Sequence, residues 1–221
     1  MGAAPEQRKK LSWWQETFLL LGLALLTSIV VKTFLLQMFF VPSASMRPQL
    51  IEDDRILVEK ISTWDGEVAR GDVVVFRDPG GWLGATPEPT GVQALLSVVG
   101  LYPDGGHLVK RAVAVGGDEV VCCDAEGRVT VNGTALRESY LEDGTAPSER
   151  QFEVVIPDDH VWVLGDNRTN SQDSRFHLDD LGQGAVPLDN VVGKVWAVVW
   201  PGDRMNVLDR PETYEEVGAG G

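Results

Sequence analysis

The sequence contains little cysteine and histidine. Its 221 residues include only two cysteines, the adjacent Cys122 and Cys123, and three scattered histidines, His107, His160 and His177. A protein zinc site needs several such ligands at characteristic spacings, so we predict no metal site and no cofactor. The cysteine pair leaves two interpretations open: a strained vicinal disulfide, or two small side chains pointing to opposite faces of a strand. The redox compartment therefore cannot be read from cysteine usage.

Basic residues are also scarce. The chain has 19 Lys and Arg against 33 Asp and Glu, for a net charge of −14, although Arg8, Lys9 and Lys10 oppose a single acid, Glu6, in the first ten residues. Nucleic-acid binding requires a basic face, so the acidic body argues against a nucleic-acid partner. The length and the 43% hydrophobic content are typical of one globular domain with an appendage.

One long apolar run lies near the N-terminus. Thr17–Phe40 contains 24 residues with one charge, Lys32, and one amide, Gln37. As a helix it would be roughly 36 Å long, enough to cross a bilayer with some tilt. Because basic residues precede the run, we expect the N-terminus inside the cell. We therefore predict a cytoplasmic stub (residues 1–15), a single-pass anchor in the cell membrane (residues 16–40) and an extracytoplasmic remainder.

A cleaved secretion signal is the competing interpretation of this run. The apolar region of such a signal spans about 7–15 residues, and Thr17–Val31 reaches the upper edge of that range. Apolar residues resume after Lys32, however, and continue to Phe40. An uncleaved anchor is therefore favoured.

After the anchor, short valine-rich runs separated by turn residues indicate strands, and no βαβ alternation is present. The expected strands are Arg55–Ile61, Asp72–Phe76, Leu108–Val115, Glu119–Cys123, Arg128–Val131, Phe152–Ile156, His160–Leu164 and Val191–Trp200. We predict an all-β fold, a compact β-barrel-like domain over residues 41–210 behind a single N-terminal transmembrane helix.

Two further stretches differ from the strands. Residues 79–106 are rich in Gly and Pro and contain an apolar piece, Val92–Val99. They read as an inserted loop with a short packed helix, or as a segment that dips into the membrane surface. The tail over residues 211–221 is acidic and glycine-rich, and we expect it to be mobile.

A possible nucleophile follows the anchor. Ser43 and Ser45 lie between Pro42 and Pro48, and each proline restricts its own φ and biases the preceding residue toward extended conformations. A serine hydroxyl needs a base that accepts its proton. No histidine has an obvious catalytic setting, and the Gly-x-Ser-x-Gly pattern is absent. The alternative base is a lysine that burial makes neutral.

Lys110 fits that role. Strand alternation over Leu108–Val115 places Lys110 on one face with Leu108, Ala112 and Ala114, and Arg111 on the other face. Apolar neighbours would lower the pKa of Lys110, and bringing it from about 10.4 to near 7 requires roughly 4–5 kcal/mol. The alternative is an ordinary surface lysine. A third polar stretch, Gly165–Arg175, suggests either a hydrogen-bonded brace or a solvated loop.

These pieces together resemble the bacterial type I signal peptidases, membrane-bound serine proteases that remove signal peptides from exported proteins. The resemblance covers nearly the whole chain and rests on several motifs in order behind an apolar anchor. The motifs are Pro-Ser-x-Ser-Met-x-Pro at Pro42–Pro48, Arg-Gly-Asp-Val-Val-x-Phe at Arg70–Phe76, the Lys-Arg strand with Gly-Asp at Lys110–Asp118, Gly-Asp-Asn-Arg-x-Asn-Ser-x-Asp-Ser-Arg at Gly165–Arg175 and Val-Pro-x-x-Asn-Val-Val-Gly-Lys at Val186–Lys194.

The resemblance implies a role for each matching residue. Ser45 would be the nucleophile and Lys110 the general base of a dyad that works through an acyl-enzyme. The supporting residues would be Ser43 at the oxyanion, Ser171 on the lysine amine, Asp173 and Arg175 as an ion pair, and Arg111 behind the base. The residues lining the substrate pockets would be Val41, Pro42, Met46, Leu50, Leu108 and Val109.

The same resemblance implies the partners. Signal peptides of exported preproteins would be cut after small residues, in an Ala-x-Ala type site, at the surface of the lipid bilayer. The chain departs from the family pattern at Thr169, where many members have aspartate, and at Ala114 and Gly116, which replace the more usual Gly and Pro. None of these is the nucleophile or the base.

Three alternatives remain to be separated by experiment. A self-cleaving Ser-Lys protease like the SOS repressors would carry a DNA-binding module. A sortase-like transpeptidase would need a lone reactive cysteine paired with histidine. A membrane-anchored, non-catalytic β-domain for envelope binding or assembly would use Ser45 and Lys110 only structurally. The sequence does not indicate an oligomeric state or the preferred preproteins.

Overall fold

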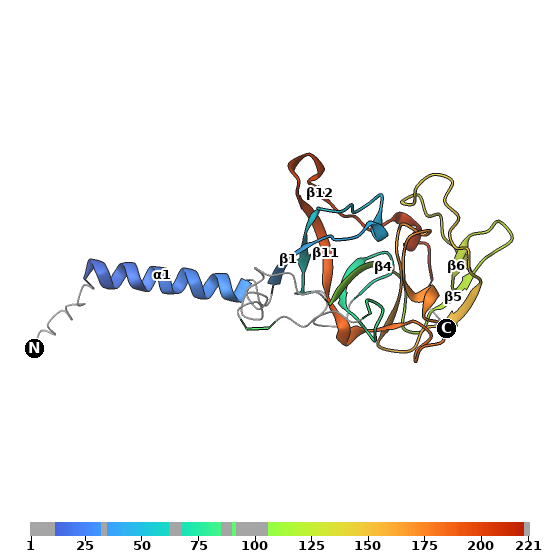
Figure 1. The fold of residues 1–221 in the computed structure, drawn as a ribbon, viewed down its shortest axis with the longest axis horizontal. Helices are drawn as coiled ribbons and strands as arrows, with labels where there is room; N and C mark the ends of the chain where they lie inside the picture. Colours follow the sequence, from blue (N-terminus) through green and yellow to red (C-terminus); the bar gives the residue numbers. More distant parts are fainter. Residues whose placement is uncertain (1–11, 32–34, 62–67, 85–89, 92–105, 219–221) are drawn as a thin grey trace, which may run out of the picture.

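The computed structural model describes residues 12–31, 35–61, 68–84, 90–91 and 106–218. In these residues one α-helix lies to one side of a body built mostly from β-strands (Figure 1). The α-helix and the strands are α1 (Trp13–Val30), β1 (Leu36–Phe40), β2 (Arg55–Glu59), β3 (Val73–Arg77), β4 (His107–Val115), β5 (Glu119–Cys122), β6 (Val129–Val131), β7 (Thr134–Ala135), β8 (Phe152–Val155), β9 (His160–Leu164), β10 (Val186–Pro187), β11 (Val191–Trp200) and β12 (Asn206–Val207). The 3-10 turns are η2 (Ala44–Met46), η4 (Ser174–Phe176), η5 (Leu188–Asn190), η6 (Gly202–Arg204) and η7 (Glu212–Tyr214). The prediction of a β-rich body is confirmed.

The apolar N-terminal run is not one continuous helix. α1 ends at Val30, whereas Leu36–Phe40 forms β1 and pairs antiparallel with β2. Met38 and Phe40 are exposed and Phe39 packs against a buried cluster, which is the alternation of a strand. The prediction of a helix through Phe40 is therefore wrong, because hydropathy alone does not separate a helix from a strand in a short apolar run.

Helix α1 carries exposed apolar side chains along its length, among them Phe18, Leu20 and Leu25. Within the described residues, no helix combines the length and apolarity needed to cross a bilayer. Several expectations lie outside the described residues: the basic stretch at 8–10, Lys32 and the apolar piece at 92–99.

The larger sheet has the strand order β1-β2-β11-β3-β4-β9-β10, and β12 also pairs with β11. All its pairings are antiparallel. In Figure 1 the sheet curls, and along the described chain it is open, with β1 and β10 at its edges. The smaller sheet has the order β7-β6-β5-β8.

Strand β4 lies inside the larger sheet and carries the candidate base. Lys110 is opposite Val74 of β3, and Arg111 is opposite Leu164 of β9. A register shift between Ala112 and Ala114 places Val113 and Ala114 in the same hydrophobic cluster. The predicted alternation is therefore wrong at Ala114, because a bulge inserts a residue that the partner strand does not match.

The cysteine pair, which the sequence left open, and the segment over residues 211–218 both have a defined structure. Cys122 and Cys123 form a vicinal disulfide at the end of β5. The segment over residues 211–218 was expected to be mobile, yet Thr213, Tyr214 and Val217 are buried in the body. That expectation is wrong for the described part, because these apolar and aromatic side chains pack although the surrounding composition is acidic and glycine-rich.

Candidate active site

Ser45 lies in the middle of η2, on the segment that follows β1. The backbone of this segment is held by Val41, whose N–H donates to Asp54 O at 2.9 Å and whose carbonyl accepts from Asp53 N at 3.1 Å. The next turn is closed by Leu50 N, which donates to Met46 O at 2.9 Å. Ser45 is therefore presented by a short turn fixed on both sides.

Lys110 meets Ser45 across 65 residues of sequence. Its Nζ donates to Ser45 Oγ at 2.7 Å and to Val109 O at 3.1 Å. The lysine is only 3% exposed. Burial lowers the pKa of Lys110 to about 8, against the opposing charges of Asp173 and Asp166. An amine with this pKa, in contact with a hydroxyl, can accept that hydroxyl's proton.

Ser43 lies beside the Ser45 hydroxyl. Its Oγ is 3.3 Å from Ser45 Oγ, with either oxygen able to donate, and the residue is exposed. Exposure leaves the Ser43 hydroxyl accessible to an incoming carbonyl group. Such a donor stabilises negative charge that develops on a carbonyl oxygen.

The loop over residues 165–175 is bound to the serine segment by Asn167. Its backbone N–H donates to Ser45 O at 3.0 Å, and its Nδ2 donates to Ala44 O at 3.1 Å. Thr169 Oγ1 donates to Asn167 Oδ1 at 3.2 Å, so the departure from the family pattern at Thr169 helps to hold this amide. The backbone at Gly165 approaches the serine segment so closely that a Cβ added to Gly165 would lie 2.5 Å from Ser45 O.

Two buried ion pairs flank the lysine. Arg111 donates from Nε and Nη2 to the carboxylate of Asp166 at 2.9 and 2.7 Å, and from Nη1 to Gly71 O at 2.8 Å. Burial alone would lower the pKa of Arg111, but the Asp166 charge raises it. Arg175 donates to Asp173 from Nε and Nη2, each at 2.8 Å. Because both carboxylates are paired, their attraction for a Lys110 ammonium is reduced.

Ser171 is close to this site but is not bonded as the family resemblance implies. It is buried, and among the described residues its Oγ has no hydrogen-bond partner. A Cβ at Gly165 would collide with this Oγ, so Ser171 lies against the same backbone that approaches Ser45. The expected hydrogen bond to the Lys110 amine is absent from the bonds found for the described residues.

The structure brings together most of the apolar residues expected at a substrate pocket. Val41, Met46 and Leu50 are buried in one cluster, and Val109 packs against it. Leu108 belongs to a different cluster with Ala112 and Val163. Pro42 is exposed. Leu108 therefore packs in a different cluster from Val41, Met46 and Leu50.

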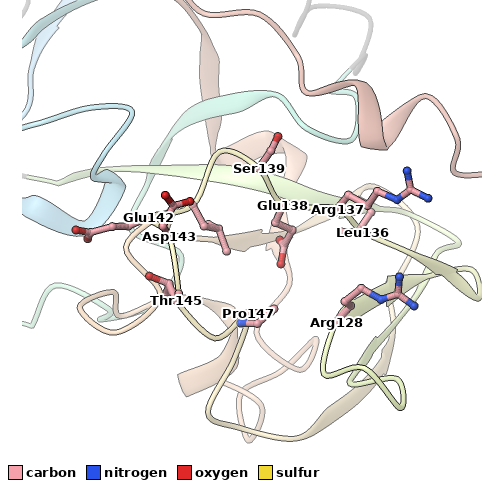
Figure 2. Close-up of a pocket in the computed structure, with 11 residues that line it drawn as sticks. Arg128, Leu136, Arg137, Glu138, Ser139, Glu142, Asp143, Thr145 and Pro147 are labelled. Atoms are coloured by element: carbon pink, nitrogen blue, oxygen red, sulfur yellow. The ribbon is translucent and has the colours of Figure 1, made fainter.

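A cavity lies elsewhere, beside the segment that follows β7 (Figure 2). None of the predicted site residues lines it; its walls include Arg128, Arg137, Glu142 and Asp143. It does border the loop over residues 165–175, because Glu138 and Pro147 in its wall accept hydrogen bonds from the buried Arg168. We therefore assign the site by the geometry of Ser45 and Lys110 and not by this cavity.

Sequence reasoning singled out the loop but assigned no role to Asp166 or Asn167. It missed Tyr140, whose ring lies 4.1 Å below the Arg111 guanidinium, and Tyr214, whose hydroxyl is 2.7 Å from that of Tyr140. The motif at Gly165–Arg175 contains Asp166 and Asn167 and was the signal that could have found them. No local pattern marked the tyrosines. Among the described residues, no group of three or more potential ligands is arranged to hold a metal ion.

Comparisons with known proteins agree on one family. The family model described as "Signal peptidase, peptidase S26" matches residues 14–200. Signal peptidase I of Mycobacterium tuberculosis is 38% identical over an aligned length of 226, and the match covers 90% of this chain and 76% of the relative. A probable signal peptidase I of Synechocystis is 32% identical, covering 95% and 86%.

Solved structures are also similar to this chain, and one of them is a signal peptidase I. The crystal structure of a signal peptidase I from Enterococcus faecalis V583 has a TM-score of 0.38 and 22% sequence identity. The match covers 58% of this chain and 96% of that chain.

Proposed function

The chain belongs to the signal peptidase family, peptidase S26, and from that premise we propose that Ser45 and Lys110 form its catalytic dyad. The chain is accordingly a protease, a hydrolase that acts in signal-peptide processing. The observation that carries the proposal is the 2.7 Å hydrogen bond from Lys110 Nζ to Ser45 Oγ, made by a lysine that is almost completely buried.

The proposed reaction proceeds through an acyl-enzyme. Ser45 Oγ attacks the carbonyl carbon of the scissile amide while its proton passes to Lys110 Nζ. The oxygen that becomes negative is stabilised by the Ser43 hydroxyl and the Ser45 backbone N–H. The C–N bond breaks as the leaving nitrogen takes the proton from Lys110. Water then attacks the ester carbon while Lys110 accepts a proton from it. The bond from the acyl carbon to Ser45 Oγ breaks, and Lys110 returns the proton to Ser45 Oγ.

The supporting residues are proposed to act on the lysine and its surroundings. The Asp173–Arg175 and Asp166–Arg111 pairs hold two carboxylates near Lys110 without leaving their charges unpaired. Along the described part of the chain the Ser171 hydroxyl has no hydrogen-bond partner. We propose that it bonds the amine or the attacking water once substrate is bound, because hydrogen bonds at such sites often form only in the complex.

The proposed specificity is for small side chains before the cut. The walls formed by Val41, Met46 and Leu50, with Val109 beside them, would exclude bulky groups from shallow apolar pockets. An extended substrate would add as a strand beside the Ser45 and Lys110 segments. Pro42 would border the opening, and we leave Leu108 out of the walls because it packs in another cluster.

The proposed partners are signal peptides of exported preproteins at a lipid bilayer. The apolar run and the exposed apolar side chains of α1 support a single-pass anchor with the N-terminus inside and the catalytic body outside the cytoplasm. Attaching enzyme and substrate to one membrane raises their effective concentration. Accessibility of single introduced cysteines at residues 5 and 215 to an impermeant thiol reagent, in a Cys122→Ser/Cys123→Ser background, tests this topology.

The decisive experiment measures preprotein cleavage by the full chain in detergent micelles. Ser45→Ala and Lys110→Ala should each reduce cleavage by at least about a thousandfold, with unchanged circular dichroism. Ser139→Ala, at an exposed serine, and Lys194→Ala, at a strand lysine paired with Asp72, are matched controls and should stay within about threefold. Near-normal activity of Lys110→Ala would reject the dyad, and activity without Ser45 would reject the nucleophile. If the chain were a non-catalytic β-domain, neither the wild type nor any variant would cleave the preprotein.

A further inference from the structure

The C-terminal segment, residues 211–218, is built into the body of the protein. Thr213 Oγ1 accepts a 2.8 Å hydrogen bond from Arg137 N, and Gly218 O accepts one of 3.0 Å from Asn132 Nδ2. Thr213, Tyr214 and Val217 are buried. These contacts tie the segment to residues that follow β6 and β7. The role of this packing is not explained by the proposed dyad itself.

Tyr214 reaches the back of the strand that carries Lys110. Its hydroxyl is 2.7 Å from that of Tyr140, and both rings are buried. Its ring also fills the space at Gly71, where a Cβ would lie 2.6 Å from Tyr214 Cδ2. The Tyr140 ring in turn lies 4.1 Å from the Arg111 guanidinium. A continuous series of contacts therefore runs from Tyr214 to the residue adjacent to Lys110.

Arg111 is held on several sides by this arrangement. It is bonded to Asp166 by two nitrogens and to Gly71 O by the third, while Tyr140 supports its open face. Tyr214 contacts two of these supports, Tyr140 and Gly71. Movement of Tyr214 would loosen both supports together.

The position of Arg111 determines how strongly Asp166 attracts a charged Lys110. The charged groups that act on the lysine are Asp173 and Asp166, and both raise its pKa against burial. Asp173 is paired with Arg175, and Asp166 with Arg111. Around Arg111 the titratable groups are Asp166, Tyr140 and Tyr214, and beyond Tyr140 lie Glu138 and Arg168.

We propose that Tyr214 is a positioning residue for the general base, acting through Tyr140 and the Arg111–Asp166 ion pair. The proposal rests on the proposed Ser45–Lys110 dyad. Without the full support of Tyr214, Arg111 neutralises Asp166 less completely, and the site favours the protonated amine. Because only the neutral amine accepts the Ser45 proton, activity is lost at neutral pH and regained at higher pH. A residue with a merely structural role would lower activity equally at every pH.

The experiment compares pH profiles of kcat/KM for preprotein cleavage by the full chain in detergent micelles. Tyr214→Phe removes only the hydroxyl, and Tyr214→Leu removes the ring. We expect the midpoint of the acidic limb to rise by about 0.5 pH units in Tyr214→Phe and by about 1 in Tyr214→Leu. Activity at pH 7 should fall about three- to tenfold, with less than about twofold loss at pH 10. Glu215→Ala, at the exposed neighbouring residue, should match the wild type.

An unchanged midpoint with equal loss at every pH, or no loss at all, overturns the proposal. If Tyr214→Leu does not fold, Tyr214→Phe decides alone, because it preserves the packing. Failure of the dyad is recognised separately: Lys110→Ala would then retain activity, or the wild-type profile would lack its acidic limb. If the wild-type pH profile has an acidic limb and activity requires Lys110, but the midpoint of that limb does not move in the Tyr214 variants, only the role of Tyr214 is rejected.

Discussion

Asn167 joins the backbone of the segment that presents Ser45, donating from its own N–H to Ser45 O at 3.0 Å and from its side chain to Ala44 O at 3.1 Å. The two segments are more than a hundred residues apart in sequence. These two hydrogen bonds fix the position of the turn that carries Ser45 relative to the loop that carries Asp166 and Asp173. The position of the Ser45 hydroxyl relative to the Lys110 amine therefore depends on a residue that hydrogen-bonds to neither of these proposed catalytic groups.

Asn167→Ala should lower kcat about tenfold with a smaller change in KM, because a small displacement of Ser45 disturbs the reacting geometry more than substrate binding. Steady-state cleavage of a preprotein measures both parameters. Asn190→Ala, which removes a 3.3 Å bond from an exposed amide to Arg77 O, is the matched control and should change kcat less than twofold. Equal effects of the two variants would contradict a specific role for Asn167.

The pH dependence of cleavage follows from the pKa of Lys110, which burial lowers to about 8. As the proposed base, Lys110 must be neutral to accept a proton, and at pH 7 roughly a tenth of it is neutral. We expect kcat/KM to rise about tenfold per pH unit below this pKa and to level off above it. Stopped assays across pH 5–10 on the full chain would show the limb. A flat profile through this range would contradict a lysine base.

Burial of Lys110 should also cost stability. Its pKa is about 8 in the folded chain, against an ordinary value of 10.5. Between these values the unfolded chain binds more protons, so stability increases as pH rises, and the cost is complete below about pH 8. Lys110→Met should therefore raise the free energy of unfolding at pH 7 by up to about 3 kcal/mol.

That gain should shrink as pH rises from about 8 and vanish only above about pH 10.5, where the amine is neutral in both states of the wild type. Chemical denaturation at several pH values measures it. Lys194→Met, which breaks the pair between a half-buried lysine and the buried Asp72, is the control and should not stabilise the chain. A Lys110→Met variant that is less stable than wild type at pH 7 would mean that contacts of the amine outweigh its desolvation.

Much of the fold was predictable because strands with one buried face carry a short-range pattern. The eight strand runs expected from valine-rich sequence coincide with β2 to β6, β8, β9 and β11 to within a few residues at their ends. β1 was missed because Leu36–Phe40 continues an apolar run, and its strand character depends on its pairing with β2. The very short β7, β10 and β12 have too few residues for a pattern.

The site was predictable where a motif was present. It was unpredictable where contacts join segments that are far apart in the sequence. Ser45 and Lys110 were identified from the serine box and from the strand that surrounds the lysine. Nothing local indicates that Tyr214, in an acidic tail, meets Tyr140, 74 residues earlier. Nor does sequence show that Ser171 Oγ is left without a partner in the described structure. Such relations exist only once the sheets have brought the segments together.

Gly165 is a position where even a methyl group should displace the turn that carries Ser45. A Cβ there would lie 2.5 Å from the carbonyl oxygen of Ser45 and closer still to Ser171 Oγ. The hydroxyl could rotate away, but the backbone oxygen could yield only by moving the serine turn. Gly165→Ala should therefore reduce kcat/KM at least about a hundredfold. Gly202→Ala, where the added methyl meets open space, should remain near wild type. Full activity of Gly165→Ala would show that the turn tolerates displacement, and that the contact between Lys110 and Ser45 does not require this close approach.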